Sequence, residues 1–378
     1  ERGLRVVVVE AHRVGWGASG RNGGQVGTGY NRSQRELEAR LGAGPARAVW
    51  DLAEAGKAQL RDFCATEAPE ARYLPGVAHG DYSAGEAAGS RAEAEHLARA
   101  YGYESITPLD RADFQALVKS PKYQGGVLDR GAGHLHPLRY ALALARAAER
   151  AGAVIHERSE VHAIDHGPRV VLRTGQGRVT AGHAIIAGNG YLPQIERRIA
   201  ARVMPINSFI AATEPLSGSW TEVLAQDIAV ADSKFVVNYF RFSEDRRFLF
   251  GGRESYSIGF PCDIGGPLQS RMQALFPQLA GVKIDHVWGG SLAITMSRLP
   301  FVARTAPNVL AAGGYSGHGV AIAGIAGRAM AEAVAGQAAG FDALAKLPVP
   351  QFPGGATFRA PLLTLAMTWY GLRDRLGF

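Results

Sequence analysis

The feature that most constrains the fold is a short apolar run near the start of the chain. Val6 to Val9 are consecutive β-branched residues, and such a run predicts a strand that is buried on both faces, as in a parallel α/β sheet. Glu10 closes this strand. A carboxylate at the end of the second strand of a dinucleotide-binding unit can accept both ribose hydroxyls of an adenosine. Taken alone, however, the run is typical of any parallel strand that precedes a helix.

A glycine-rich loop follows this strand. Residues 17–25 combine glycines with the polar side chains of Ser19, Arg21, Asn22 and Gln25. Glycine-rich backbone offers bare N–H groups and allows the chain to approach a flat or anionic ligand closely. The strand and the loop together favour a nucleotide cofactor over a plain strand.

A second glycine-rich loop lies near the other end of the chain. Residues 308–312 predict a last buried strand, which leads through residues 313–320 into a helix of small residues over 321–334. A helix N-terminus carries about half a positive charge and free N–H donors, which suit an anionic ligand. Residues 183–190 form another short apolar strand that runs into glycines, and they predict either a ligand contact or a plain turn.

Between these loops, residues 202–300 differ in character from the rest of the chain. Aromatic residues and alternating patterns dominate there, and they predict a mostly antiparallel sheet with a hairpin turn at 243–247. Tyr239 and Trp288 belong to these aromatics and are candidates for the wall of a substrate cavity. Core packing is the more frequent role of such side chains.

Local signals predict the remaining elements. Helices are expected over 31–67, with a break near 42–45, and over 110–119, with Asp110 as the N-cap. Short strands are expected over 71–85 with a turn at Pro75 and Gly76, and a turn-rich connector over 125–133.

Charge and composition exclude several classes of function. The 41 basic and 34 acidic residues give a formal net charge of +7 and are spread along the chain. This mild excess suits an anionic ligand such as a pyrophosphate, and without a basic tract interleaved with aromatics it argues against nucleic-acid binding. No apolar run is long enough to cross a bilayer, so stable membrane insertion is not expected.

The cysteines and histidines favour a metal-free protein of a reduced compartment. Cys64 and Cys262 match no metal or redox spacing, which predicts a cytoplasmic protein. The start of the chain shows no signal peptide. His134 and His136 have no third ligand nearby, so no metal site is expected.

The opening residues raise a question about completeness. Glu1 to Gly3 look like the last turn of a helix with its C-terminal glycine. A dinucleotide fold places its G-x-G-x-x-G loop roughly 20 residues before the acidic residue at the strand end, and here that room is missing before Glu10. The expectation is either a dinucleotide fold without its first strand and loop or a different fold.

With both glycine loops considered, the chain resembles the FAD-dependent D-amino-acid oxidase and glycine oxidase superfamily, and within it the gamma-glutamylputrescine oxidases. The resemblance rests on the strand end at Glu10, on the two loops over 17–25 and 313–319, on Arg298-Leu-Pro300, and on the tail over 352–367.

This resemblance implies an α/β fold (α+β overall) with two domains. A discontinuous, glutathione-reductase-type, Rossmann-like FAD-binding domain would comprise residues 1–70, 129–200 and 301–340, and would lack its N-terminal strand and G-x-G-x-x-G loop. A mostly antiparallel substrate domain would comprise residues 71–128 and 201–300. Residues 341–378 would form a tail that packs on the body.

The resemblance also implies a set of cofactor contacts. Glu10 would bind the adenosine ribose, Val161 the adenine, and the first glycine loop the pyrophosphate and the isoalloxazine ring. The second loop would place N–H groups where negative charge develops when the flavin is reduced. The implied FAD-binding residues are Glu10, Ala11, Ser19, Arg21, Asn22, Gly23, Gly24, Gln25, Val161, Ala187, Gly188, Gly313, Gly314, Tyr315, Ser316, Gly317, His318, Gly319 and Val320.

The mode of cofactor attachment and the substrate contacts follow from the same resemblance. Family members with a covalent flavin use a cysteine shortly before the second loop, and residues 263–378 contain none, so FAD is expected to be non-covalent. Tyr239, Trp288 and Tyr315 are the candidate substrate contacts. His318 is the candidate catalytic residue, with a purely structural role as the alternative, and Arg21 is a candidate for a substrate carboxylate or for flavin oxygens.

The implied reaction is the oxidation of a primary or secondary amine resembling γ-glutamylputrescine. A hydride would pass from the carbon next to the neutral amine to flavin N5, the imine would hydrolyse to an aldehyde, and O₂ would become H₂O₂. The protein would mainly hold the C–H bond over N5 and keep the amine unprotonated. The partners would be this amine and O₂, with the oligomeric state left open.

Two other functions stay open at this point. The chain could be a truncated, non-catalytic remnant that cannot hold FAD. It could also be an NAD-dependent dehydrogenase, because Glu10 would serve NAD equally well, although a single Rossmann unit does not need the second glycine loop at 313–319.

Overall fold

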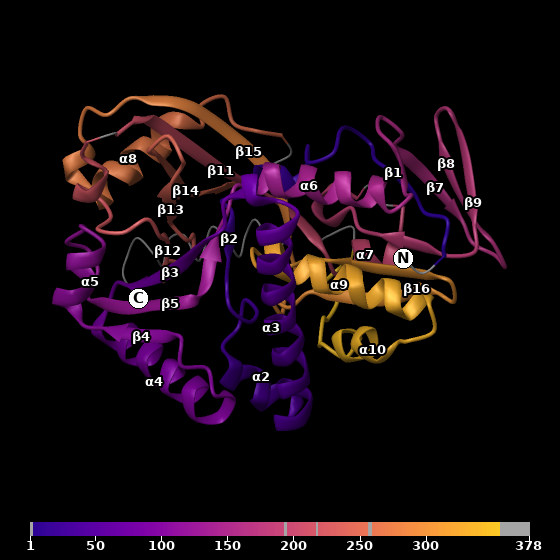
Figure 1. The fold of residues 1–378 in the computed structure, drawn as a ribbon, viewed down its shortest axis with the longest axis horizontal. Helices are drawn as coiled ribbons and strands as arrows, with labels where there is room; N and C mark the ends of the chain where they lie inside the picture. The colour runs from indigo at the N-terminus through magenta and orange to yellow at the C-terminus, as the bar shows by residue number, and fades with distance from the viewer. Residues whose placement is uncertain (1–2, 193–194, 217, 256–258, 356–378) are drawn as a thin grey trace.

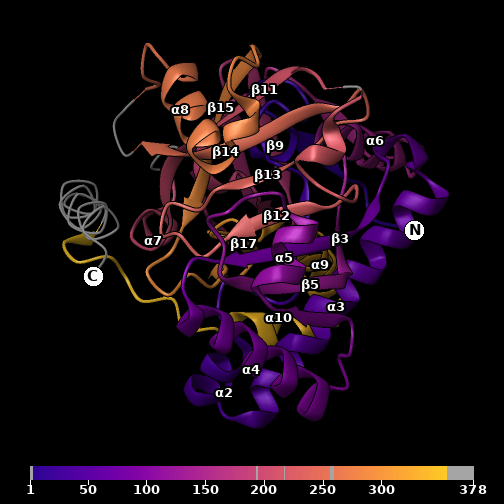
Figure 2. The same cartoon turned by 90° about the vertical axis from the view of Figure 1, so that its left-hand side faces the viewer.

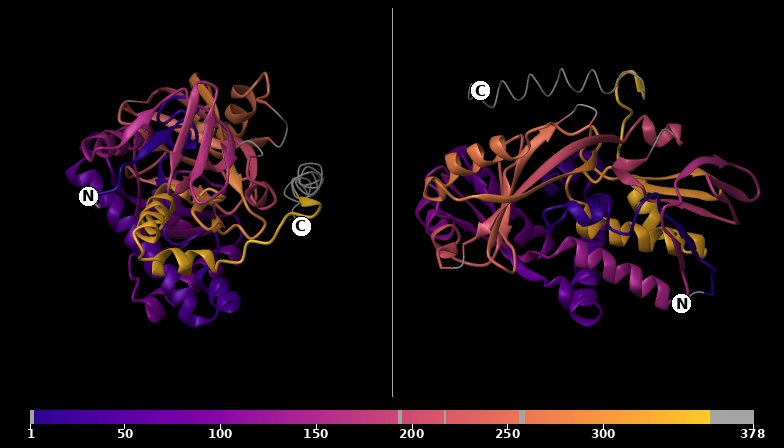
Figure 3. Two further views of the ribbon diagram at one scale, coloured as in Figure 1. Left: turned by 90° about the vertical axis from the view of Figure 1, so that its right-hand side faces the viewer. Right: turned by 90° about the horizontal axis from the view of Figure 1, so that it is seen from above.

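The computed structural model describes residues 3–192, 195–216, 218–255 and 259–355 (Figure 1). A large curved sheet with its covering helices occupies one side of the molecule, and a group of smaller sheets occupies the other (Figures 1 and 3). The long helix α3 (Ala43–Thr66) runs between the two sides. This is the mixed α/β architecture that the sequence predicts.

The larger sheet has nine strands in the order β15-β11-β14-β13-β12-β3-β5-β2, with β4 beside β5. Most of its pairs are antiparallel, as predicted, and β12 pairs in parallel with β3. The strands are β2 (Gln25–Val26), β3 (Leu74–Asp81), β4 (Ile106–Leu109), β5 (Gly125–His134), β11 (Met204–Pro215), β12 (Ala229–Asp232), β13 (Tyr239–Phe242), β14 (Arg247–Ser255) and β15 (Ile284–Ile294).

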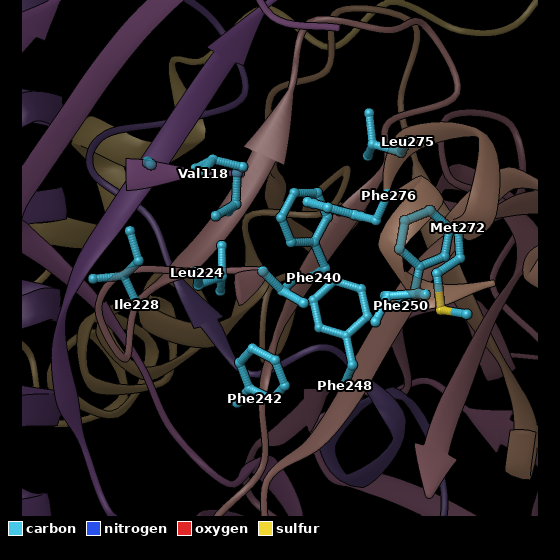
Figure 4. Close-up of a cluster of buried hydrophobic side chains, with 14 of the residues drawn as sticks. Val118, Leu224, Ile228, Phe240, Phe242, Phe248, Phe250, Met272, Leu275 and Phe276 are labelled. Carbon is cyan, nitrogen blue, oxygen red and sulfur yellow. The ribbon is translucent and has the colours of Figure 1, made fainter. Parts of the chain in front are cut away.

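One face of this sheet packs against α8 (Gly265–Leu275) through an aromatic core (Figure 4). Phe240 and Phe248, which lie on neighbouring strands, both meet the ring of Phe276 edge-on, at centroid distances of 5.1 and 5.4 Å. Edge-to-face contacts add to the hydrophobic gain from burying the rings. These aromatics of the 202–300 region therefore belong to the core.

The smaller sheets contain the parallel strands expected near the two ends of the chain. β1 (Val7–Val9) pairs in parallel with β6 (Val154–His156), and β10 (Ala184–Ile186) pairs in parallel with β17 (Val309–Gly313). β16 (Phe301–Ala306) lies antiparallel to β17, and β7 (Val161–Asp165), β8 (Val170–Thr174) and β9 (Gly177–Ala181) form an antiparallel meander.

The prediction that the first strand is buried on both faces was wrong. Val6, Val7 and Val8 are 46%, 44% and 40% exposed. β1 pairs with β6 on one edge, and no strand of the described residues pairs with its other edge or with the free edge of β10. β1 has one paired neighbour among the described residues, so fewer side chains pack over its faces than over a strand inside a wider sheet.

The helices pack around the large sheet and the group of smaller sheets. α3 packs on α9 (Gly319–Val334), where Gly56 leaves room for Ile325. The break between α2 (Gln34–Leu41) and α3 lies at Gly42, as predicted. The remaining helices are α1 (Ala18–Arg21), α4 (Ala84–Tyr101), α5 (Arg111–Leu117), α6 (Pro137–Arg150), α7 (Arg197–Ala200) and α10 (Ala339–Ala345), with short 3₁₀ turns η1 (Pro69–Ala71), η2 (Asn189–Tyr191), η3 (Trp220–Glu222) and η4 (Pro277–Leu279).

Two predicted turns are in fact strand residues. Pro75 and Gly76 lie inside β3, where a register shift against β5 and a φ of 111° at Gly76 absorb the irregularity. The predicted connector at 125–133 is most of β5, whose glycines make room for aromatic rings: a Cβ at Gly126 would lie 2.5 Å from Phe114. Figure 2 shows β12, β3 and β5 stacked between α8 and α4.

The described part of the C-terminal region packs on the body. Phe352 is buried beside Met204 and Ile206, and its N–H donates to Ala201 O over 2.9 Å. The rest of the predicted tail, residues 356–378, lies outside the described residues. None of the helices that the structure describes combines the length and the apolar character needed to cross a bilayer.

Candidate active site

A cavity of about 1890 Å³ connects the two sides of the molecule. It begins at the end of β1, passes the first glycine loop and the end of β10, and reaches the second glycine loop and the inner strands of the large sheet. Pockets for a small ligand usually enclose about 300–1,000 Å³. This cavity therefore has room for a ligand of dinucleotide size together with a small substrate.

Glu10 lies at one end of the cavity, directly after β1. Its backbone N–H continues the parallel ladder by donating to His156 O over 2.9 Å, and its Oε1 accepts the N–H of His12 over 2.9 Å. The second carboxylate oxygen makes no hydrogen bond with the described residues. Val161, Ala187 and Gly188 line the cavity with it, so these predicted adenosine-side residues are brought together.

Side-chain hydrogen bonds hold the first glycine loop in shape. The Asn22 side chain donates to Ala18 O over 2.8 Å and accepts the N–H of Gly24 over 2.8 Å. The Arg21 guanidinium donates to the backbone carbonyls of Trp16 and Gly289, at 2.6 and 3.0 Å. Arg21 thus ties this loop to β15.

The loop is also pressed against the large sheet. A Cβ at Gly23 would lie 2.9 Å from the Tyr239 ring, and one at Gly24, where φ is +77°, would lie 2.0 Å from Leu135 O. The buried Arg241 donates to Gly23 O over 2.6 Å. Burial lowers the pKa of Arg241 to about 10, so it is still charged at neutral pH. Only glycine fits at these two positions, which explains the Gly-Gly pair.

The second glycine loop has a similarly fixed backbone. Gly314 has a φ of +69°, and its N–H donates to Asn189 Oδ1 over 2.8 Å. The next turn places Ser316 at a φ of 51°, with its N–H donating to Ala293 O over 2.9 Å and its carbonyl accepting the Asn31 side chain. Residues 315–320 line the cavity beyond this turn.

This loop places the N-terminus of α9 at the cavity wall. His318 is the N-cap residue, and no side chain of the described residues caps the helix. Gly319 and Val320, the first residues of the helix, line the cavity. Uncapped N–H groups and the positive end of the helix dipole together favour a ligand atom that carries or gains negative charge.

His318 is half-buried and lines the cavity beside this helix end. Burial lowers the pKa of its imidazole to about 4, with a smaller effect from the positive charge that His79 can carry. At neutral pH His318 is therefore uncharged. A Cβ at Gly27 would lie 3.3 Å from His318 Nε2, so a glycine at that position allows the close approach.

The sheet side of the cavity contains residues for a substrate. The hydroxyls of Tyr239 and Ser208 are 3.2 Å apart, and both residues line the cavity together with Tyr315. Residues that the sequence did not single out as site residues line it as well: Asn31, His79, Lys234, Phe235 and Arg298. Lys234 and Phe235 share one loop and the others come from separate parts of the chain, and of the five only Arg298 belonged to a recognised motif.

Most of the sequence-predicted site residues share this cavity. Trp288 is not among the lining residues; its indole N–H donates to Arg21 O over 3.0 Å and so supports the first loop. Gly24, Gly313 and Gly314 also lie behind the wall, where they shape the backbone. The predicted residues that line the cavity are Glu10, Ala11, Ser19, Arg21, Asn22, Gly23, Gln25, Val161, Ala187, Gly188, Tyr239 and Tyr315 to Val320.

The chemistry of the wall fits FAD. An acidic residue at the adenosine end, two close-packed glycine loops and an uncapped helix N-terminus follow one another along a continuous space. No group of three or more potential metal ligands occurs among the residues described.

Comparison with known proteins identifies the family. The sequence model of the DAO family, described as FAD dependent oxidoreductase, matches residues 1–333. The probable oxidoreductase OrdL of Rhizobium meliloti is 42% identical over 374 residues, which are 99% of this chain and 87% of that protein. The gamma-glutamylputrescine oxidoreductase of Escherichia coli is 37% identical over 379 residues, 100% of this chain and 89% of that protein.

Solved structures share the fold at low sequence identity. Glycine oxidase from Geobacillus kaustophilus superposes with a TM-score of 0.74 at 20% identity, covering 89% of each chain. L-proline dehydrogenase from P. horikoshii gives a TM-score of 0.73 at 17% identity, covering 88% of this chain and 87% of that one. The family match indicates a flavin enzyme and not a nicotinamide dehydrogenase, and the solved structures show the same fold. The chain belongs to the DAO family of FAD-dependent oxidoreductases.

Proposed function

We propose that this protein is an amine oxidase that acts on a primary or secondary amine of the γ-glutamylputrescine type. The cavity carries the proposal, because it joins Glu10 and the two glycine loops to a polar pocket at Tyr239 and Ser208 without interruption. The identity of 37% to a gamma-glutamylputrescine oxidoreductase supports the choice of substrate class.

In this proposal the residues of the FAD-dependent site divide into two groups. Glu10, Val161, Ala187 and Gly188 hold the adenosine and pyrophosphate end, and the loops over 17–25 and 313–320 hold the remainder. When bound, FAD would supply a hydride acceptor and a route for the two electrons to O₂, which would become H₂O₂. The absence of cysteine from residues 263–378 supports non-covalent attachment.

The chain's own residues would supply orientation and charge. The uncapped N-terminus of α9 stabilises negative charge that develops at the cavity wall. The neutral His318 adds no positive charge beside it and offers a hydrogen bond to the substrate. Tyr239 and Ser208 orient the amine, and cations in the same cavity, such as Arg298, disfavour its protonated form.

The proposal includes the division into domains and a location. The cofactor domain would comprise residues 1–70, 129–200 and 301–340, and the substrate domain residues 71–128 and 201–300. The described free cysteines, Cys64 and Cys262, are in keeping with a reduced compartment, and we place the enzyme in the cytoplasm.

Spectroscopy on the purified protein tests the proposal. Visible flavin absorbance that acid precipitation releases into the supernatant is expected for non-covalent FAD. Mixing the protein with a γ-glutamyl amine in the absence of oxygen should bleach this absorbance. The same mixture in air should yield H₂O₂. A flavin-loaded protein that no γ-glutamyl amine, diamine or glycine derivative bleaches would overturn the proposal. If the flavin is bleached but no H₂O₂ forms in air, the electron acceptor is a molecule other than O₂.

A further inference from the structure

A histidine and a carboxylate lie side by side on β3, at the sheet end of the cavity. His79 lines the cavity, and its Nε2 lies 3.5 Å from Oδ1 of Asp81. The side chain of His79 is 43% exposed, whereas that of Asp81 is 1% exposed. A Cβ at Gly80 would lie 2.8 Å from the Tyr123 ring in the core. Because side chains alternate along a strand, His79 and Asp81 share the opposite face of the sheet.

Asp81 is a buried carboxylate with His79 as its positive partner. Helix α4 packs against β3, and Oδ2 of Asp81 is buried without a hydrogen bond from the residues that the structure describes. Burial raises the pKa of this carboxyl, and the charge that His79 can carry is the largest effect that opposes the rise. A buried carboxylate with few donors is stabilised when a cation forms beside it. Asp81 therefore favours a proton on His79.

Other charged or titratable side chains lie around this pair on the neighbouring elements. They are Glu86 on α4, Asp232 on β12, Lys234 in the loop after β12, and His318 before α9. Glu86 and Asp232 already accept backbone N–H groups of their own turns. Lys234 is a cation, and His318 is a weaker base than an ordinary imidazole, because burial lowers its pKa to about 4. Among these groups His79 is therefore the best acceptor for a proton near neutral pH.

His79 also shares a face of the large sheet with the proposed substrate contact Tyr239. Ala231 on β12 pairs with His79 on one side and with Tyr239 on the other. Neighbouring strands lie about 4.8 Å apart, so His79 and Tyr239 rise from the same face about 10 Å apart. The small side chain of Ala231 lines the cavity between them. An amine above Ala231 is therefore within reach of the Tyr239 hydroxyl and of the His79 imidazole.

We propose that His79 takes the proton from the ammonium group of the substrate, with Asp81 as the positioning residue behind it. The inference rests on the proposed function and deepens it. One N–H bond of the ammonium breaks, its electron pair stays on the nitrogen, and the proton bonds to the ring nitrogen of His79 that is not paired with Asp81. The lone pair then forms the C=N bond as the hydride leaves the carbon. The hydride and this proton together supply the two hydrogens of H₂O₂.

Flavin reduction in the absence of oxygen separates this role from a structural one. With a γ-glutamyl amine near neutral pH, H79Q should be reduced about 100-fold more slowly than wild type, which is within the usual contribution of a general base. The rate in H79Q should then rise about tenfold per pH unit in the alkaline range, because more of the substrate arrives as the neutral amine. D81N should show a smaller loss with the same rise. A loss in H79Q that is equal at every pH would overturn the inference.

A second histidine–carboxylate pair provides the matched control. His166 faces Glu196 at 3.8 Å with 42% of its side chain exposed, and it is not among the described residues that line the cavity. H166Q should therefore match wild type at every pH.

A measurement without turnover distinguishes failure of this inference from failure of the proposed function. The probe is a γ-glutamyl diamine whose free amine stands on a carbon with two methyl groups, so that carbon has no hydride to lose. In flavin-loaded protein with isotope-labelled histidine, NMR identifies His79 by the ring resonance that is missing from H79Q. At about pH 8, where a free imidazole is neutral, the probe should move this resonance to its protonated position. The trimethylammonium form of the probe has no proton to give and should leave the resonance in place.

Equal shifts with the two probes, or no shift with either, would overturn the inference. If the first probe protonates His79 but no amine reduces the flavin of the wild type, the proposed function fails and the proton acceptor stands.

Discussion

At the scale of single residues, the buried His134 and the half-buried His318 make the stability of the protein depend on pH. Burial lowers the pKa of His134 and of His318 to about 4, from an ordinary value near 6.5. The unfolded chain therefore binds protons at these sites between about pH 6.5 and pH 4, while the folded protein does not. The stability that each neutral histidine contributes is fully present above about pH 6.5 and decreases as the pH falls through this window.

This linkage gives a prediction for His134, which lies on β5 with its Nε2 3.3 Å from Asp227 O. Between pH 7 and pH 5 the site should lower the free energy of unfolding by about 2 kcal/mol. Urea denaturation at both pH values measures the loss, which should be smaller in His134→Gln. The exposed His162 on β7 is the control, and His162→Gln should keep the wild-type pH dependence. An unaltered slope in His134→Gln would contradict the prediction.

Glycine positions in the loops allow a second prediction at this scale. Gly24→Ala should destabilise the protein by more than 1 kcal/mol and weaken flavin retention, because φ is +77° and the new Cβ would lie 2.0 Å from Leu135 O. The matched control is Gly89→Ala, in the middle of α4 and open to solvent. That change should stabilise the protein by about 0.5–1 kcal/mol. Thermal unfolding of both variants, with and without added FAD, measures the contrast, and similar effects would contradict it.

At the scale of elements, the packing of α8 on the large sheet depends on a few aromatic rings. Phe248 on β14 is fully buried and meets Phe276 and Phe240. Phe248→Ala should cost about 3–5 kcal/mol of unfolding free energy, since it removes a ring and leaves a cavity. Phe260, which is 47% exposed, is the control, and its replacement by Ala should cost far less. Chemical denaturation compares the two, and a mild effect at Phe248 would mean that the core collapses to fill the space.

Elements with strong local signals could be predicted from the sequence. The N-cap at Asp110, whose carboxylate accepts the N–H of Asp113 over 2.9 Å, and the helix break at Gly42 both follow from short-range chemistry. The turn predicted at Pro75 and Gly76 inside β3, and the connector predicted in place of β5, were wrong because these glycines and Pro75 look like turn residues in isolation. The need for glycine at these positions comes from residues that are distant in sequence. For example, a Cβ at Gly133 would lie 2.4 Å from the Tyr73 ring. Such tertiary requirements leave no local pattern.

The candidate site shows the same limit. Glu10 and the two glycine loops were found because backbone approach to a nucleotide demands particular residues in a contiguous stretch. Lys234 and Phe235 carry no such pattern, because they reach the cavity wall only through the loop that Asp232 shapes beside Arg298. Trp288 was a reasonable candidate for the cavity wall, yet its indole supports the backbone of the first loop instead.

At the scale of the whole molecule, a cofactor in the cavity would contact both sides and so would stabilise them together. A ligand that binds only the folded state stabilises it by about 3 kcal/mol when its free concentration is roughly 100 times its dissociation constant. Removal of FAD should therefore lower the melting temperature, and added FAD should restore it. Because the cavity is walled by both sides of the molecule, tryptophan fluorescence and far-ultraviolet circular dichroism should shift together. Two transitions that move independently would show that the sides unfold separately.

The path of the chain has a consequence for recombining this enzyme with its relatives. The parallel strands β1, β6, β10 and β17 come from segments that are far apart in sequence, and strands of the large sheet lie between them along the chain. Among the described residues, neither the large sheet nor the group of smaller sheets is formed by one continuous segment of the chain. A chimera that exchanges the large sheet between two relatives therefore needs several crossover points at once, and each must keep the strands in register. Single-crossover libraries would mostly join half of one core to half of another, so specificity in this scaffold is better altered by point changes on the cavity wall than by swapping segments.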